Sequence, residues 1–226
     1  MTNAELAASP ATRSGDPTRH QLVLAALELF AVEGVNATSI RSITAHAGAA
    51  NQSAVHYHFR NKDGLILAVL DYVNEQLTPP QNEALLELKR MKRQRALNVR
   101  EIVSIGFAPY VQMYLSSQEG QICLRFLSRL TWESGPDAQD LLLEKVRPYF
   151  LKILPYLEAA CPDKPHDALD FQLYLAAANL IHGLSDLTLL SRQTSGSVAK
   201  LLKNRPEDML SYFIDYIAGG LLSPTG

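Results

Sequence analysis

The chain has 226 residues, of which 47% are hydrophobic and 19% are charged, and its formal net charge is −2. This length and apolar content are enough to bury a core in one large or two modest domains. The lack of a basic excess argues against strong non-specific binding to a polyanion, but it leaves sequence-specific binding to DNA open.

Residues 1–16 are rich in small and polar residues and lack the apolar stretch of a signal peptide, so we expect a flexible arm. No apolar run reaches the roughly 18 residues that a membrane span needs. Cys123 and Cys161 form no CxxC pair and show no Cys-His spacing typical of zinc. Two cysteines in a chain of this size need no disulfide. We therefore expect a cytoplasmic protein without a bound metal or cofactor.

The segment from residue 38 to residue 65, TSIRSITAHAGAANQSAVHYHFRNKDGL, is the most informative part of the chain. Thr38 is a suitable N-cap for a helix whose apolar stripe is formed by Ile40, Ile43 and Ala47. Gly48 is expected to end this helix in a left-handed conformation.

A second short helix is expected to begin near Asn51. It can bury few side chains, so its outer face is polar and able to form hydrogen bonds. Two short helices joined by a glycine turn are typical of a helix-turn-helix unit, whose second helix enters the major groove of DNA. The residues expected to point outward are Asn51, Gln52, Ser53 and His56.

This segment resembles the signature of the tetracycline-repressor (TetR) family. The resemblance is carried by Ala47-Gly48, the triplet Tyr57-His58-Phe59, Lys62 and Leu65, and by a preceding apolar helix that ends at Glu33-Gly34. It covers roughly residues 18 to 70. The spacing from Ala47 to Phe59 is one residue longer than the commonest family spacing, which predicts a longer turn.

The resemblance implies contacts with DNA for seven residues. Thr38, Tyr57 and Lys62 are expected to contact backbone phosphates, and Asn51, Gln52, Ser53 and His56 to face base edges. The residue chemistry agrees, because lysine at a helix start suits phosphate and the amides of Asn and Gln can pair with adenine.

The rest of the chain is predicted to be helical, without a strand pattern or an internal repeat. A helix over residues 62–77 is expected to end at Pro79-Pro80, and another over 98–117 to kink at Pro109. Further helices are expected over 121–133, 137–160, 166–191 and 207–222. The sequence thus predicts an all-α protein with a three-helix helix-turn-helix domain over residues 17–65 and a larger effector-binding and dimerisation domain over 66–226.

Two groups of charged or titratable residues have competing interpretations. The run KRMKRQR at 89–95 is either a solvated helix face, as such runs usually are, or an anion-binding patch. His56 and His58 are at i and i+2 on a helix and cannot readily hold one metal ion. His182 with Asp186 is better explained as a core histidine beside an acid than as a catalytic pair, since no nucleophile elbow or paired carboxylates accompany them.

Resemblance to the family also implies a small-molecule pocket in the C-terminal domain. Aromatic residues gather around the helix that Pro109 is expected to kink, which favours an apolar or aromatic effector. The expected lining residues are Phe107, Tyr110, Met113, Tyr114, Phe126 and Arg129.

The last two long helices are predicted to form a homodimer as a four-helix bundle, because both carry apolar residues on more than one face. Phe171, Tyr174, Tyr212 and Tyr216 lie beside the main apolar stripe. The residues predicted for the interface are Leu173, Ala177, Leu180, Leu184, Phe213 and Ile217.

Together these features predict a ligand-responsive regulator of transcription, a dimer that is released from operator DNA by its effector. The alternative is an all-α small-molecule-binding protein or adaptor that does not read DNA. No constellation in the sequence supports an enzyme.

Overall fold

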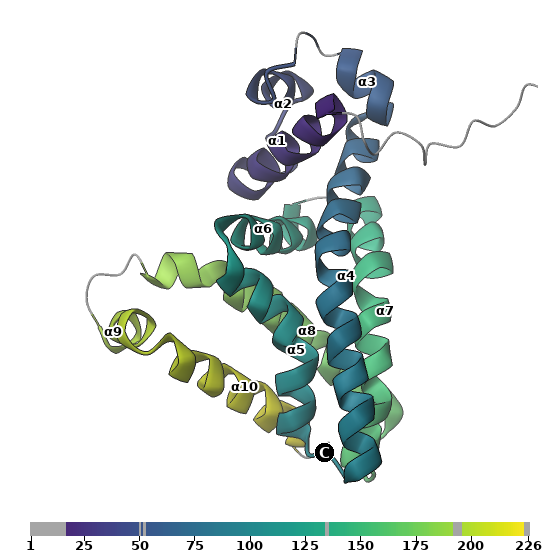
Figure 1. Cartoon of the computed structure of the whole chain (residues 1–226), viewed down its shortest axis with the longest axis vertical. Helices are drawn as coiled ribbons and strands as arrows, with labels where there is room; N and C mark the ends of the chain where they lie inside the picture. The colour runs from purple at the N-terminus through teal and green to yellow at the C-terminus, as the bar shows by residue number, and fades with distance from the viewer. Residues whose placement is uncertain (1–16, 50, 52, 134–135, 192–195, 224–226) are drawn as a thin grey trace, which may run out of the picture.

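The computed structural model describes residues 17–49, 51, 53–133, 136–191 and 196–223. These residues form helices and no strand, which confirms the predicted all-α fold (Figure 1). The helices are α1 (Pro17–Glu33), α2 (Ile40–His46), α3 (Ser53–Phe59), α4 (Lys62–Gln94), α5 (Val99–Ser116), α6 (Gln118–Glu133), α7 (Pro136–Ala160), α8 (His166–Ser191), α9 (Ser197–Asn204) and α10 (Pro206–Leu222). The arm predicted over 1–16 lies outside the described residues.

The first three helices gather at one end of the molecule around a small apolar core (Figure 1). Leu22 and Phe30 of α1, Ile43 of α2 and Val55 of α3 have no exposed surface. Because α2 and α3 have only seven residues each, they are too short to be stable alone and depend on this packing.

Helix α4 continues through Pro79-Pro80 to Gln94, so the prediction that the two prolines end it was wrong. Prolines remove backbone donors and oppose a helix interior. Here Leu77 before the prolines and Leu88 after them are both buried, so one side of α4 packs against the core along its length. Tertiary packing therefore outweighs the local preference to end the helix.

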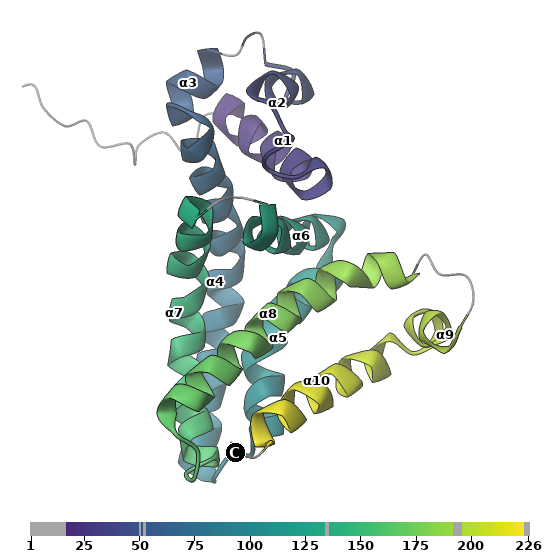
Figure 2. The same ribbon diagram turned by 180° about the vertical axis from the view of Figure 1, so that it is seen from behind.

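In the C-terminal unit, α5 and α7 pack against α4, and α7 runs beside it. Helix α8 packs on α6 and α7, α10 packs on α5 and α8, and α6 lies directly beneath α1 (Figures 1 and 2). An aromatic cluster joins α5 to α7: Tyr110 stacks on Phe150 at 5.5 Å between ring centroids, and Phe107 meets Phe150 edge-on at 5.6 Å. Gln81 donates a hydrogen bond to the Tyr110 hydroxyl at 3.2 Å, so this polar atom is satisfied in the core.

Most predicted helix limits agree with the structure. Helix α5 begins after Asn98, whose side chain accepts from the Glu101 backbone N–H in a capping box. Helices α8 and α10 correspond closely to the segments predicted at 166–191 and 207–222. Helix α9 was not predicted, because eight residues are too few to establish a helical period.

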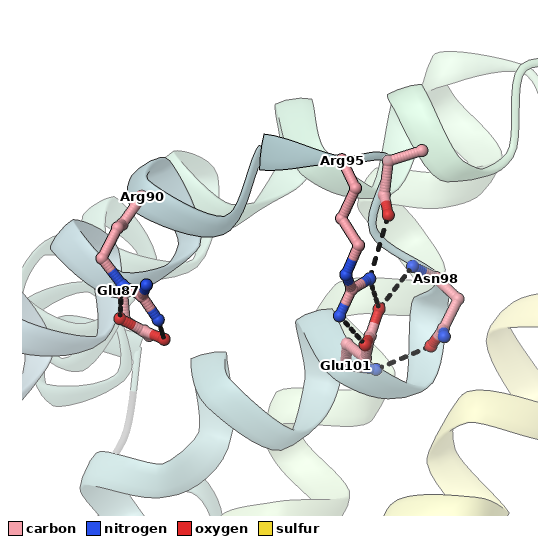
Figure 3. A network of polar contacts seen from close by, with 6 residues as sticks. Glu87, Arg90, Arg95, Asn98 and Glu101 are labelled. Carbon is pink, nitrogen blue, oxygen red and sulfur yellow. Dashed lines mark hydrogen bonds and ion pairs between the residues drawn. The ribbon is translucent and has the colours of Figure 1, made fainter. Parts of the chain in front are cut away.

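The basic run 89–95 lies at the end of α4 that is farthest from α3 (Figure 1). Arg90 makes two hydrogen bonds with Glu87 at 2.7 and 2.6 Å, and Arg95 makes two with Glu101 at 2.9 and 2.5 Å (Figure 3). Lys92 lies 5.1 Å from the Tyr156 ring centroid. Three of the basic side chains thus have partners within the chain, which favours the interpretation as a helix face.

Candidate nucleic-acid interface and effector cavity

Helix α2 is capped by Ser39 rather than by Thr38. The Ser39 hydroxyl accepts from the Ser42 backbone N–H at 3.0 Å, and the Ser42 side chain accepts from the Ser39 N–H at 3.1 Å. Thr38 is 1% exposed, and its hydroxyl donates to the Gly34 carbonyl at 2.7 Å. The N-cap prediction was therefore wrong by one residue, and the Thr38 side chain is buried with its hydroxyl bonded inside the protomer.

The turn between α2 and α3 begins as predicted, with Gly48 at a φ of +65°. Its Cβ position would be open, so glycine is favoured there by backbone conformation rather than by space. At the far end of the turn, the Asn51 side-chain oxygen accepts from the Ser53 backbone N–H at 2.9 Å and also from the Ser53 hydroxyl. Asn51 therefore caps α3 with its oxygen and retains its amide N–H donors for other partners.

Helix α3 presents a polar outer face. Val55 and Phe59 are buried, while Ser53, His56 and Tyr57 are exposed, Tyr57 by 63%. His56 Nδ1 is 2.8 Å from the Arg60 carbonyl oxygen. Because a carbonyl only accepts, Nδ1 carries the proton and Nε2 is the acceptor of the neutral ring. This side chain therefore has a fixed orientation and one free hydrogen-bonding atom.

A strained turn joins α3 to α4. Arg60 has a φ of +69°, which is uncommon for a residue other than glycine. Asn61 caps α4 by accepting from the Gly64 backbone N–H at 2.8 Å, and a Cβ at Gly64 would lie 2.0 Å from the Phe59 carbonyl oxygen. Lys62 thus stands at the first position of α4, as predicted, where burial lowers the pKa of its ammonium group.

The structure brings most of the predicted DNA-contact residues to one end of the molecule, on α3 and at the two turns that flank it. Gln52 lies outside the described residues. Arg41, exposed on α2, and Arg60, exposed at the α3–α4 turn, were not among the predicted residues. Nothing in the sequence pattern distinguished these two from other surface arginines.

Helix α6 connects the N-terminal unit to the rest of the protein. Phe126 stacks on Phe30 of α1 at 6.1 Å between ring centroids, and an Arg129 N–H donates to the Val32 carbonyl of α1 at 3.4 Å. These two predicted effector ligands therefore contact the N-terminal unit instead. Helix α6 therefore packs directly against α1.

Helix α8 holds α6 through a histidine. His182 Nδ1 lies 2.8 Å from the Ser128 hydroxyl, and its Nε2 lies 2.9 Å from the Thr131 hydroxyl, both on α6. Burial lowers the pKa of His182, although the Asp186 carboxylate acts in the opposite direction. The hydrogen-bond partners of His182 are thus two hydroxyl groups. Asp186, which was predicted as its neighbour, raises its pKa through its charge.

An apolar cavity of about 200 Å³ lies between α6, α7 and α8. Leu142, Val146 and Ile181 contribute apolar walls, and Arg147 and Asp170 lie at its edge and form an ion pair at 2.8 Å. Phe150 also lines it, with Tyr110 and Phe107 packed behind that ring. None of the six predicted effector residues lines this cavity.

The other predicted effector residues are also placed elsewhere. Phe107 and Tyr110 are buried in the aromatic cluster, and Met113 lines a different cleft beside Pro109. Tyr114 is partly exposed on α5, with its carbonyl accepting from Gln121 at 3.3 Å.

The residues predicted for the dimer interface lie mostly inside the protomer. Leu173, Leu180, Leu184 and Ile217 are each at most 4% exposed, Ala177 is also buried and Phe213 is partly buried. The second apolar side of the same helices is open instead, with Phe171 62% exposed and Tyr216 67% exposed. The stripe predicted to form the dimer interface is therefore buried in the protomer core, and the stripe beside it is the exposed one. The core uses the stripe with the better helical spacing.

A helix-turn-helix unit with a polar outer helix, packed on α6 of a helical unit with an apolar cavity, defines a helix-turn-helix regulator with a separate ligand-binding unit. The model of bacterial regulatory proteins of the tetR family matches residues 22–69. The model of the tetracyclin repressor-like C-terminal domain matches residues 106–220, more than half of the chain. The chain belongs to the TetR family of bacterial regulatory proteins.

Individual relatives agree with this assignment. The HTH-type transcriptional dual regulator CecR of Shigella flexneri is 36% identical over 96 residues, which are 41% of this chain and 42% of CecR. The aligned part therefore spans less than half of that relative.

Two solved structures share the fold. FadR from Bacillus subtilis in complex with stearoyl-CoA has a TM-score of 0.54 at 15% identity, over 92% of this chain and 99% of FadR. A TetR-family regulator from Marinobacter aquaeolei VT8 has a TM-score of 0.56 at 14% identity, over 91% of this chain and 95% of its own. Among the described residues, no helix is long and apolar enough to cross a membrane.

Proposed function

We propose that the protein is a homodimeric transcriptional repressor that leaves its operator when a small apolar or aromatic effector binds. The observation that carries this proposal is the outer face of α3. Its polar side chains are exposed and His56 is oriented by the Arg60 carbonyl, while the opposite side of the same helix is buried. A short helix held in this way suits insertion into the major groove.

Within this proposal, the residues near α3 divide into two kinds. Ser53, His56 and the amide N–H groups of Asn51 face base edges, and Gln52 joins them on the basis of the family resemblance. Tyr57 and Lys62 contact phosphates, which position the protein without reading sequence. Thr38 is not assigned a side-chain contact, because its hydroxyl is bonded inside the protomer.

The effector is proposed to occupy the cavity between α6, α7 and α8. Its volume of about 200 Å³ lies below the range of roughly 300–1,000 Å³ usual for ligand pockets, which favours a compact effector. Arg147 and Asp170, which line the cavity, already form an ion pair with each other. An uncharged apolar effector can therefore bind without leaving either charge unpaired. Thr131 of α6 lines this cavity, and α6 contacts α1 through Phe126 and Arg129.

The dimer is proposed to form through the exposed sides of α8 and α10, which lie on one side of the molecule (Figure 2). Large exposed apolar side chains on adjacent helices are typical of a protein interface. Two such helices from each protomer would meet about a two-fold axis, and the axis supplies the symmetry of a split operator. The exposed residues assigned to this surface are Phe171, Leu175, Tyr212 and Tyr216.

The test is a mobility-shift titration with DNA that flanks the protein's own gene and with random DNA of equal length. The cognate fragment is expected to bind about 10³-fold or more tightly than random DNA at physiological salt. Equal affinity for both fragments, or binding to neither, would favour the alternative of a small-molecule-binding adaptor that does not read DNA.

A further inference from the structure

A second cleft, of about 190 Å³, lies between α4, α5 and α6 and is separate from the effector cavity. In contrast to that cavity, it is lined by amide and hydroxyl side chains as well as by proline rings. Gln76 and Pro80 come from α4, Pro109 and Gln112 from α5, and Glu119 from α6. Such a mixed lining suits a small ligand with a polar head and a short carbon skeleton.

The tandem prolines remove the helical N–H donors of one backbone carbonyl beside this cleft. In a helix the carbonyl of Gln76 accepts from the N–H four residues on, or three residues on in a tighter turn. Those residues are Pro80 and Pro79, and neither has an N–H. Gln76 and Pro80 both line the cleft, and the Gln76 carbonyl, which in a helix points along the axis toward residue 80, lacks these two N–H donors.

The charge of the lining is negative. Among the described residues that line the cleft, Glu119 is the one with a formal charge, and none is a lysine or an arginine. The Glu119 carboxylate accepts a hydrogen bond from the Tyr72 hydroxyl of α4, and a charged donor in the cleft can compete with that hydroxyl for the carboxylate. A ligand with several N–H donors and a positive charge would satisfy both this carboxylate and the Gln76 carbonyl.

We propose that this cleft binds a small primary ammonium compound through Glu119 and the Gln76 carbonyl. The rings of Pro80 and Pro109 and the Met113 side chain supply apolar contact for the carbon skeleton of the compound. Because Glu119 is exposed, added salt screens the attraction, and the affinity falls as ionic strength rises.

The cleft is connected to the N-terminal unit by Tyr72. The same residue that donates to Glu119 meets His20 of α1 edge-on at 5.9 Å between ring centroids. An ammonium group at Glu119 competes with the Tyr72 hydroxyl and thereby alters its contact with α1. This second step rests on the proposed function, since its readout is affinity for operator DNA.

Binding is tested by calorimetry on the full chain without DNA, with three probes of equal chain length: butylammonium, 1-butanol and butyrate. Butylammonium is expected to bind, and Glu119→Gln to weaken it at least tenfold. Glu75→Gln is the control, because it makes the same change in net charge one helical turn from Tyr72. Glu75 does not line the cleft, so this variant is expected to change the affinity for butylammonium less than twofold. Equal binding of 1-butanol, unchanged binding in Glu119→Gln, or no binding of butylammonium would each overturn the proposal.

The connection to α1 is tested with Tyr72→Phe. Removal of the competing hydroxyl is expected to raise the affinity for butylammonium and to abolish its effect on operator affinity. A Tyr72→Phe protein whose operator affinity still responds to butylammonium would overturn the coupling. If the wild type binds no operator at all, the proposed function fails while the calorimetric result on the cleft still stands.

Discussion

Lys62 and His56 lie on either side of the α3–α4 turn, and their chemistry toward DNA differs. Lys62 is a point charge at a helix start, which suits any phosphate regardless of sequence. His56 is held by the Arg60 carbonyl and offers one defined hydrogen-bonding atom, which suits a base edge. The two residues should therefore contribute to affinity and to specificity, respectively.

Lys62→Ala is expected to weaken binding to cognate and random DNA alike and to lower the slope of log affinity against log salt by about one. His56→Ala is expected to cost about 1–3 kcal/mol on the cognate site and little on random DNA. Titrations of both fragments at several salt concentrations measure both effects. Equal losses on the two fragments for His56→Ala would remove His56 from the base-reading face.

Gly64 is a second residue whose role is fixed by local geometry. Its Cβ would lie 2.0 Å from the Phe59 carbonyl oxygen, so Gly64→Ala must shift the backbone between α3 and α4. We expect the free energy of unfolding to fall by about 1–3 kcal/mol or more in urea titrations. Gly219→Ala is the control, since nothing lies within 4 Å of its Cβ, and should stabilise α10 by about 0.5–1 kcal/mol. Equal stabilities of the two variants would contradict this account.

At the scale of elements, α6 is held from two sides. Phe126 and Arg129 join it to α1, and the hydroxyls of Ser128 and Thr131 join it to His182 of α8. Because Thr131 donates its own proton to the Ser128 carbonyl, its oxygen accepts from His182 Nε2, and in the neutral ring Nδ1 then accepts from the Ser128 hydroxyl. Protonation of His182 would make both ring nitrogens donors and reverse the Ser128 hydrogen bond.

The pKa of His182 is lowered in the folded protein, so below its unfolded value of about 6.5 the unfolded chain binds more protons. The free energy of unfolding is therefore expected to fall as pH drops from about 7.5 to about 5.5. His182→Gln should reduce this loss. His166→Gln should steepen it, because the Glu158 hydrogen bond raises the pKa of His166 and stabilises the folded state in acid. Denaturant titrations at the two pH values measure these slopes, and parallel slopes for wild type and His182→Gln would exclude His182 as the cause.

At the scale of the whole molecule, α8 and α10 each carry two apolar sides, and the protomer core covers only one of them. The stripe through Leu184 and Ile217 packs inward, while Phe171 and Tyr216 remain open. The inner side of α10 is buried at Ile217 and Leu221, and the exposed ion pair of Arg100 with Asp215 at 2.5 Å adds a contact between α5 and α10. A second protomer is proposed to cover the open side of α10.

Phe171→Asp with Tyr216→Asp is expected to give folded monomers in light scattering and to lose tight operator binding, because carboxylates oppose association at the dimer surface. Leu184→Asp with Ile217→Asp is expected to unfold the protomer instead, since it places carboxylates inside the core. Circular dichroism distinguishes the two results. A Phe171→Asp, Tyr216→Asp protein that stays dimeric would place the interface on other helices.

The sequence by itself determined the all-α fold, the helix-turn-helix segment, the left-handed Gly48 and the start of α4 at Lys62. These features depend on local spacing, caps and backbone conformation, which a short segment contains in full. Only the tertiary structure decided that α4 passes Pro79-Pro80, that Phe126 meets α1 and that the stripe through Leu184 faces inward. Each of these depends on which distant surface is available for packing, and an apolar helix face looks the same in sequence whether a core or a partner covers it.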